Sequence, residues 1–431
     1  MLVAQYDMFS AMANAPNISP RVCFIQTMGG MGQHGRKDAD NSASVGSFGA
    51  LAVRNEIPYP YSIVPITQIR KYDFALLSLT SVVEIMNILL DVRKYGLDKG
   101  KCKIIAGGMG CLNIWPLRDI IDVAVFGRAE GQIADIIDGA TPSNVWRKEL
   151  DYDLGGRYII RQARGLLPGE RGIGCPNKCL YCQYTHVRQY LNLGTGYRAA
   201  AVDSVYEDDW NRLQFKSGRN ITAWDGLSQE TRYRVHKAVS DKAIYDKLVA
   251  LREYSLRRTS NIKIFNIVGY PWETPETYNR DMDSVRELLR SADGKTGTRI
   301  LIMMMHTPFS PEPYTPMEGE CVNFTDWRDI ANIRGRQIFK GDKIEAFVLP
   351  QIAKPHTLQR RIAMNYANRL NYNQVIKFIL SAKEPIDDFY NTLSVTGEGL
   401  PSLTLGKEDY EVVPDCGSGK THNAIRTGAI E

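Results

Sequence analysis

Three cysteines lie within eight residues of each other in the stretch GIGCPNKCLYCQY. They are Cys175, Cys179 and Cys182, and their spacing is C-x3-C-x2-C. Thiolates this close together hold metal ions or iron–sulfur clusters, or act as redox pairs. His186 follows four residues later, and with the three thiols it would make a Cys3His zinc set. No second C-x2-C pair follows in the sequence, although most four-ligand structural zinc sites use two such pairs.

The spacing also differs from the C-x2-C-x2-C run of bacterial ferredoxins, in which four thiolates close the cluster. Three thiolates on a [4Fe–4S] cluster leave one iron open, and an open iron can bind a substrate or cofactor. The pattern therefore favours a cluster that takes part in chemistry. A zinc site, a redox pair and a chance grouping remain as alternatives.

The motif resembles that of the radical S-adenosylmethionine (SAM) enzymes, C-x3-C-x-aromatic-C, with Tyr181 as the aromatic residue. The resemblance implies that Cys175, Cys179 and Cys182 hold a [4Fe–4S] cluster. It also implies that SAM chelates the open iron and that one electron cleaves SAM to a 5′-deoxyadenosyl radical, which abstracts hydrogen from the substrate. The backbone of Tyr181 would lie near the adenine.

Three later segments resemble further parts of the same enzymes: AWDGLSQETRYRVHKAVSD (223–241), IFNIVGYPWET (264–274) and MMMHTPFSPEPYTPMEGE (303–320). Taken alone, each could supply only turn, cap or core residues. Their order behind the cysteine motif favours the functional interpretation. The resemblance implies a SAM site made by Tyr181, Asp225, Ser228, Gly269 and Glu273, with Asp225 and Ser228 near the ribose or carboxylate.

The first part of the chain alternates short apolar runs with helical patterns. Buried strands are predicted at 21–28, 61–66, 73–79, 102–106 and 122–126, and a helix at 82–94. This alternation predicts a Rossmann-like, doubly wound parallel sheet. Glycine-containing links follow two of the strands, at 106–113 and 126–132, where backbone can approach a ligand closely.

The second part repeats the alternation. Strands are predicted at 220–224, 262–268 and 299–305, with helices at 240–254 and 275–289. This layout suits a full or partial α/β (TIM-like) barrel, whose active site is built at the carboxyl ends of the strands. We expect an N-terminal arm (1–20), a Rossmann-like domain (21–145), a radical SAM barrel (146–340) and a mainly helical C-terminal appendage with a flexible tail (341–431).

A Rossmann-like domain ahead of the cysteines is typical of the cobalamin-binding branch of these enzymes, and the resemblance covers roughly residues 21–320. It implies that Ser78, Ser81, Gly107, Gly108 and Glu130 surround a corrin. Ala129 departs from the branch's glutamate, and the D-x-H-x-x-G ligand motif is absent. His34 lies in the corresponding region, and a loop imidazole of this kind is more often solvated. Many members of the branch lack this ligand, so cobalamin is not excluded.

The reaction favoured by the cobalamin resemblance is methyl transfer to a substrate carbon. One alternative is a radical rearrangement without cobalamin. Another is methylthiotransferase chemistry, in which Cys23, Cys102 and Cys111 would hold a second cluster, although buried cysteines are common. The last is a metal-stabilised binding protein without turnover. No other residue is assigned a catalytic role, because His306 and His356 are lone histidines.

The composition, 44% hydrophobic and 23% charged, is that of a globular protein in water. The sequence has no signal-peptide pattern and no apolar run of about 18 residues, so we expect a cytoplasmic protein without membrane contact. Its net charge of +5 leaves the substrate open among a small molecule, a peptide and a nucleic acid. A one-electron donor such as flavodoxin or ferredoxin is expected. The segment 414–423 resembles a P-loop but is followed by too few residues for a helix.

Overall fold

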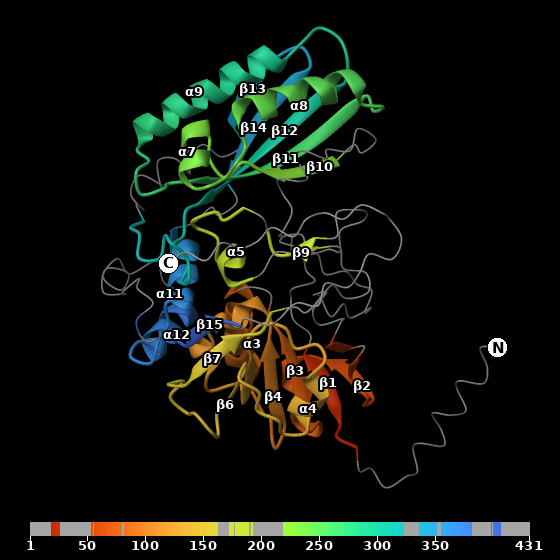
Figure 1. The fold of residues 1–431 in the computed structure, drawn as a ribbon, viewed down its shortest axis with the longest axis vertical. Helices are drawn as coiled ribbons and strands as arrows, with labels where there is room; N and C mark the ends of the chain where they lie inside the picture. The colour runs from red at the N-terminus through yellow and green to blue at the C-terminus, as the bar shows by residue number, and fades with distance from the viewer. Residues whose placement is uncertain are drawn as a thin grey trace, which may run out of the picture.

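The computed structural model is a mixed α/β protein with two separate, largely parallel sheets (Figure 1). It describes residues 19–25, 53–54, 56–79, 82–162, 172–175, 177–188, 191–192, 219–322, 336–350, 355–381, 398 and 400–406. The predicted α/β class is confirmed. None of the helices within these ranges is both long enough and apolar enough to cross a bilayer.

The first sheet has the strand order β2-β1-β3-β4-β5-β6. Its strands are β1 (Val22–Ile25), β2 (Tyr61–Val64), β3 (Phe74–Ser78), β4 (Lys103–Gly107), β5 (Val123–Val125) and β6 (Val145–Arg147). All neighbours are parallel except β5 and β6. The helices of this region are η2 (Ile66–Lys71), α3 (Val82–Tyr95), η3 (Met109–Leu112), η4 (Trp115–Leu117) and α4 (Ile133–Ile137). Each predicted strand and the predicted helix is present, and residues 26–28 of the first predicted strand lie outside the described residues.

In this sheet β2 lies on one side of β1, and β3, β4 and β5 follow on the other side. The order in which the chain adds parallel strands therefore changes direction between β1 and β3. In doubly wound sheets, ligands bind beyond the carboxyl ends of the strands at such a switch point. Ser78 ends β3 there and pairs in register with Gly107, the last residue of β4. The backbone therefore brings these two residues side by side at the edge where a ligand site is expected.

The second sheet has the order β10-β11-β12-β14-β13. Its strands are β10 (Arg219–Ala223), β11 (Thr259–Val268), β12 (Arg299–Pro308), β13 (Arg336–Lys340) and β14 (Ile344–Pro350). Four of them are parallel, and β13 is antiparallel to β14. The sheet is open across the residues that the structure describes, so the predicted full or partial α/β barrel is not confirmed.

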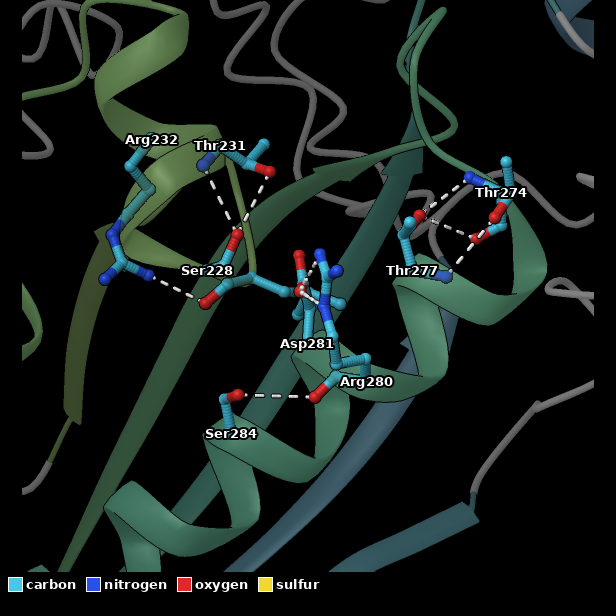
Figure 2. A network of polar contacts seen from close by, with 9 residues as sticks. Ser228, Thr231, Arg232, Thr274, Thr277, Arg280, Asp281 and Ser284 are labelled. Carbon is cyan, nitrogen blue, oxygen red and sulfur yellow. Dashed lines mark hydrogen bonds and ion pairs between the residues drawn. The ribbon is translucent and has the colours of Figure 1, made fainter.

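The long strands β11 and β12 alternate between buried and half-buried residues. Their buried face is covered by α8 (Asp241–Tyr254) and α9 (Pro275–Ala292), which lie side by side in Figure 1. Apolar side chains on α9 pack into this layer, and each buried aliphatic side chain stabilises the fold by about 1.5–3 kcal/mol. Thr274 and Thr277 form a capping box at the start of α9 (Figure 2), which fixes where this helix leaves the loop after β11.

The C-terminal segment returns to the first sheet. Its elements are α11 (Pro355–Asn365), α12 (Tyr372–Leu380) and β15 (Ser402–Leu405), and β15 pairs in parallel with β7 (Arg157–Ile160). Leu358, Ile362 and Phe378 join the hydrophobic core beneath the first sheet. The amide of buried Asn113 donates hydrogen bonds to three carbonyls at the end of α11, those of Met364, Asn365 and Ala367.

Candidate functional site

The cysteine loop lies at the carboxyl ends of the second sheet. It runs from the short strand β8 (Gly172–Ile173) to α5 (Gln183–Val187), and β8 pairs with β9 (Leu191–Asn192). The N–H of Leu180 donates to the carbonyl of Val235 at 3.1 Å, and the N–H of Met317 donates to the carbonyl of Leu180 at 3.2 Å. These bonds fix the loop between the segments that follow β10 and β12.

The three thiols differ in their surroundings. Cys179 is 3% exposed, and its Sγ lies 3.9 Å from the carbonyl oxygen of His236. Cys175 is half-buried, and its Sγ lies 3.8 Å from Nδ2 of Asn177. Burial raises the pKa of the Cys182 thiol to about 12, and the nearby Glu312 carboxylate adds to this shift. A proton or a bound cation is therefore needed to stabilise this sulfur.

None of the seven described cysteines is in a disulfide. Within the described residues, no three Cys, His, Asp or Glu side chains converge closely enough to hold a metal ion. The chemistry of the donor set nevertheless fits an iron–sulfur cluster, because three thiols share one anchored loop of eight residues. The structure thus supplies suitable ligand atoms on a fixed backbone without bringing the sulfurs into ligating positions.

His186 does not join the thiols. Its Nε2 lies 3.1 Å from the carbonyl oxygen of Cys179, to which it donates, and burial lowers the pKa of the ring. The imidazole is thus engaged with the backbone of the loop. This contact weighs against the Cys3His zinc set.

Asp225 lies in the loop after β10, with a φ of 57°, which is unusual for a residue other than glycine. Its carboxylate is 2.9 Å from Nζ of Lys237, and both side chains are nearly buried. The hydroxyl of Tyr270, which follows β11, donates to the Asp225 carbonyl at 2.6 Å. Asp225 is thus held by the next loop along the sheet and lies close enough to raise the pKa of Cys182 and Tyr181.

Replacing Lys237 with methionine should destabilise the second sheet, because the Asp225 carboxylate would lose its partner in a nearly buried place. We expect a loss of about 2 kcal/mol in the free energy of unfolding. The control is Lys242→Met, because the Lys242 side chain is 81% exposed and pairs with the exposed Asp246 on α8. This control should cost less than about 0.5 kcal/mol. Urea unfolding followed by tryptophan fluorescence checks both, and equal losses would contradict the expectation.

An aromatic cluster walls the site on one side. Tyr270 stacks on Trp272 with ring centroids 5.0 Å apart, and it also contacts the rings of Phe309 and Tyr181. Burial raises the pKa of both Tyr181 and Tyr270, so neither phenol ionises near neutral pH. The guanidinium of Arg234 covers the outer ring of the cluster, that of Trp272, at 3.9 Å. The cysteine loop thus rests on an apolar wall.

Gly269 and Glu273 form a turn at the end of β11. Gly269 has a φ of 77°, and its N–H donates to the carboxylate of Glu273. Glu273 is 7% exposed, and burial raises its pKa to about 7, despite hydrogen bonds from Gly269 and Tyr270 that act in the opposite direction. Tyr270, which follows Gly269 in the same turn, contacts Asp225, so this turn lies beside the Asp225 loop. The Glu273 carboxylate, however, already accepts a hydrogen bond within its own turn.

Ser228 is the N-cap of α7 (Gln229–Arg234), and its hydroxyl accepts a hydrogen bond from the N–H of Thr231 at 3.3 Å (Figure 2). Its backbone carries the chain out of the Asp225 loop. The structure therefore gives Ser228 a local structural role. A SAM contact from this hydroxyl remains a prediction.

Two positioning residues were not predicted from the sequence. Arg232 is fully buried and donates to the carbonyls of Gly226, Leu227 and Val239, which holds the Asp225 loop in shape. Its place in the segment 223–241, four residues after Ser228, was the available signal. Glu312 accepts from the N–H of Gln183 at 3.2 Å and pairs with Arg361 of α11 at 2.6 Å. No signal in the sequence indicates that second contact.

Of the residues predicted around a corrin, Ser78, Gly107, Gly108 and Glu130 are described, and they lie at or after the carboxyl ends of strands of the first sheet. Gly108 has a φ of 102°, and a Cβ there would lie 2.2 Å from the Leu79 carbonyl oxygen, so packing alone requires this glycine. A Cβ at Gly107 would make only ordinary contact, 4.0 Å from Val125. Glu130 pairs with Arg128 at 3.0 Å. Ser81 and His34 lie outside the described residues.

The cysteines considered for a second cluster are core residues. Cys23, Cys102 and Cys111 are each at most 2% exposed and belong to the hydrophobic core of the first sheet. Burial raises the pKa of Cys23 and of Cys102 to about 12 and that of Cys111 further still. This environment disfavours thiolates, so it weighs against a second cluster.

The remaining sequence candidates add no residue to the site. His306 is 1% exposed on the helix-covered face of β12, where its Nε2 lies 3.1 Å from the Tyr278 hydroxyl of α9. This is a core position. The side chain of His356 and the segment 414–423 lie outside the described residues.

No known protein family matches the sequence, and no curated protein is significantly similar to it. A similar solved structure is that of the apo, selenomethionine-labelled cobalamin-dependent S-adenosylmethionine radical enzyme OxsB. The identity is 12% and the TM-score 0.24, over 89% of this chain and 57% of that one. This chain thus spans just over half the length of that enzyme, and a TM-score of this size does not establish a common fold.

Proposed function

We propose that this protein is a radical SAM enzyme. The observation that carries the proposal is the C-x3-C-x2-C loop, anchored through Leu180 against the segments after β10 and β12 of a parallel sheet. Catalytic groups of α/β enzymes gather at this end of the strands. A purely structural metal site would not require loops from three neighbouring strands to meet there.

In this proposal Cys175, Cys179 and Cys182 would hold a [4Fe–4S] cluster. When bound, the cluster supplies the electron that cleaves SAM to methionine and a 5′-deoxyadenosyl radical. Asp225 faces the same end of the sheet and offers a carboxylate for ribose hydroxyls, oriented by Lys237. The apolar wall around Tyr270 excludes water from the radical. A flavodoxin- or ferredoxin-like protein is the proposed electron donor.

Anaerobic reconstitution with iron and sulfide, followed by dithionite and SAM, tests the proposal. The expected result is a brown protein with about four irons per chain that forms 5′-deoxyadenosine. Formation must depend on reductant, on SAM and on iron. A colourless protein with one tightly held zinc per chain and no 5′-deoxyadenosine would overturn the proposal in favour of a metal-stabilised binding protein.

A second candidate is cobalamin-dependent methyl transfer to a substrate carbon. The strand order of the first sheet favours it, with a switch point beside Ser78 and Gly107. Of the residues predicted for the corrin, Gly107 leaves space for a ligand, whereas Gly108 is held against Leu79 and Glu130 against Arg128. The described residues thus do not make a complete corrin site, and the proposed reaction includes no step on cobalamin.

Corrin content decides between the candidates. Protein loaded anaerobically with hydroxocobalamin and then desalted should retain about one corrin per chain if the methyl-transfer candidate holds. Iron and 5′-deoxyadenosine formation without retained corrin would favour a radical rearrangement. The substrate is proposed only as a group bearing an unactivated C–H bond, whether on a small molecule, a peptide or a nucleic acid.

A further inference from the structure

A single carboxylate joins the cysteine loop to the helix α11 of the C-terminal segment. Glu312 lies in the loop after β12, and its Oε2 accepts a hydrogen bond from the N–H of Gln183 at 3.2 Å. Gln183 directly follows Cys182 and is the first residue of α5. The other oxygen of the same carboxylate, Oε1, lies 2.6 Å from Nη2 of Arg361 on α11. The carboxylate therefore holds a backbone group next to a motif cysteine on one side and a guanidinium on the other.

Both ends of this link lie on fixed elements. The side chain of Gln183 donates from Nε2 to the carbonyl of Pro313 at 3.2 Å, so α5 and the loop after β12 are joined at two points. On the other side, Arg361 precedes the fully buried Ile362, and α11 packs into the hydrophobic core of the first sheet. The guanidinium thus reaches the cysteine loop from a helix that belongs to the other sheet.

The ion pair is partly shielded from water. The side chain of Glu312 is 20% exposed and that of Arg361 is 32% exposed. Among the described residues, Glu312 is the carboxylate that pairs with Arg361, and Nε of this guanidinium has no hydrogen-bond partner. The charge of Glu312 also acts on Cys182, because it helps to raise the pKa of that thiol. Loss of Arg361 would therefore leave an unbalanced negative charge beside this sulfur, where water screens it poorly.

We propose that Glu312 and Arg361 are positioning residues for the cysteine loop, in which the carboxylate holds the start of α5 and the guanidinium balances the carboxylate's charge beside Cys182. This inference rests on the proposed radical SAM function. The reduction potential of an iron–sulfur cluster depends on the net charge and the hydrogen bonds around it. An unbalanced carboxylate opposes the uptake of an electron, whereas a neutral ion pair does not. The C-terminal segment would thus control a property of the cluster, although it supplies none of the three motif cysteines.

Hydrogen–deuterium exchange on the full chain, without iron or SAM, tests the positioning of the loop. In Arg361→Gln the Gln183 amide should exchange about tenfold faster, because the carboxylate that accepts from it is no longer held. Arg361→Lys keeps the charge, guards against misfolding of the glutamine variant, and should restore most of the protection. The matched control is Arg369→Gln, because Arg369 is exposed between α11 and α12, and it should exchange as the unmodified protein does. Unchanged exchange in Arg361→Gln would overturn the positioning role.

Redox titration of the anaerobically reconstituted protein, followed by electron paramagnetic resonance, tests the charge balance. Arg361→Gln should move the midpoint potential to a more negative value, because the Glu312 charge is then unbalanced. Glu312→Gln keeps an acceptor for the Gln183 N–H and should move the potential the opposite way. The double variant loses both charges and should return close to the potential of the unmodified protein. A merely structural pair would not give shifts of opposite sign, so equal potentials in all four proteins would overturn the charge balance.

Failure of this inference is distinct from failure of the proposed function. If the unmodified protein takes up no iron and forms no 5′-deoxyadenosine, the proposed function fails together with the charge balance at a cluster. The metal-free exchange then still decides whether Arg361 positions the loop. If the unmodified protein forms 5′-deoxyadenosine but its exchange and potential match those of the Arg361 and Glu312 variants, the proposed function stands and the role of the ion pair is overturned.

Discussion

Alanine at Cys175, Cys179 or Cys182 should each lower the formation of 5′-deoxyadenosine by at least about 100-fold, because a cluster with two thiolate ligands is lost or misplaced. The three effects should be similar and should not add, because each ligand is needed for the same cluster. Iron content per chain and the electron paramagnetic resonance signal of the reduced protein should fall together with activity.

Cys321→Ala is the matched control, since Cys321 is exposed and lies in the loop after β12, outside the cysteine motif. It should keep its iron and its activity. Loss of iron in this control to the same degree would show that the three motif cysteines have no special role. Retention of 5′-deoxyadenosine formation in all three motif variants would contradict the proposed function itself.

The predictable parts of the fold are those governed by local patterns. β3 and β4 are continuous apolar runs that end in serine and glycine, and such runs indicate strands buried on both faces. The helix α9 begins at Thr274 and Pro275, a cap followed by a proline, both visible in the sequence. In each case the residues that decide the structure lie within a few positions of each other.

Contacts between distant segments were not predictable in the same way. Asn113 captures the end of α11, about 250 residues later, and the choice of partner depends on the tertiary fold. The strand β14 was expected to begin a helical appendage, yet it pairs with β12 in the second sheet. Isoleucine and valine runs indicate a strand, but they carry no information about which strand they will join.

The candidate site shows the same division. The motif spacing identified the cysteine loop and Asp225, and the structure brings both to one end of the second sheet. Ser228 and Gly269 matched the same patterns, but their visible contacts are a helix cap and a tight turn. A sequence pattern reports that a residue type is needed at a position. It does not separate a residue that touches a ligand from one that shapes the loop around it.

The second large effect is on the pH dependence of stability. Two buried groups of the second sheet, Glu273 after β11 and His306 in β12, have pKa values that shift in opposite directions. Burial raises the pKa of Glu273 from 4.5 to about 7 and lowers that of His306 from 6.5 to about 3. Glu273 keeps a proton in the folded state that the unfolded chain releases, so its contribution to stability falls as pH rises from 4.5 to 7. His306 does the reverse, and its contribution is lost as pH falls below 6.5.

The two slopes should cancel between pH 4.5 and 6.5, each having a magnitude of about 1.4 kcal/mol per pH unit. Replacing one of the two residues should therefore reveal the pH dependence of stability that the other contributes. Glu273→Gln keeps an acceptor for the Gly269 N–H, and its stability should rise with pH across this window by about 3 kcal/mol relative to the unmodified protein. His306→Gln can still meet the Tyr278 hydroxyl, and its stability should fall over the same range.

Urea unfolding at pH 4.5, 5.5, 6.5 and 8, followed by tryptophan fluorescence, measures these slopes, since Trp115, Trp146 and Trp224 are buried in the folded protein. Glu287→Gln serves as the control, because its side chain is 65% exposed on α9, and its curve should run parallel to that of the unmodified protein. At pH 8 Glu273→Gln should be the more stable protein by about 3 kcal/mol, since the buried carboxylate is then charged only in the unmodified chain. Parallel curves for all four proteins would mean that neither group changes its proton affinity on folding, and the burial of the turn after β11 would have to be abandoned.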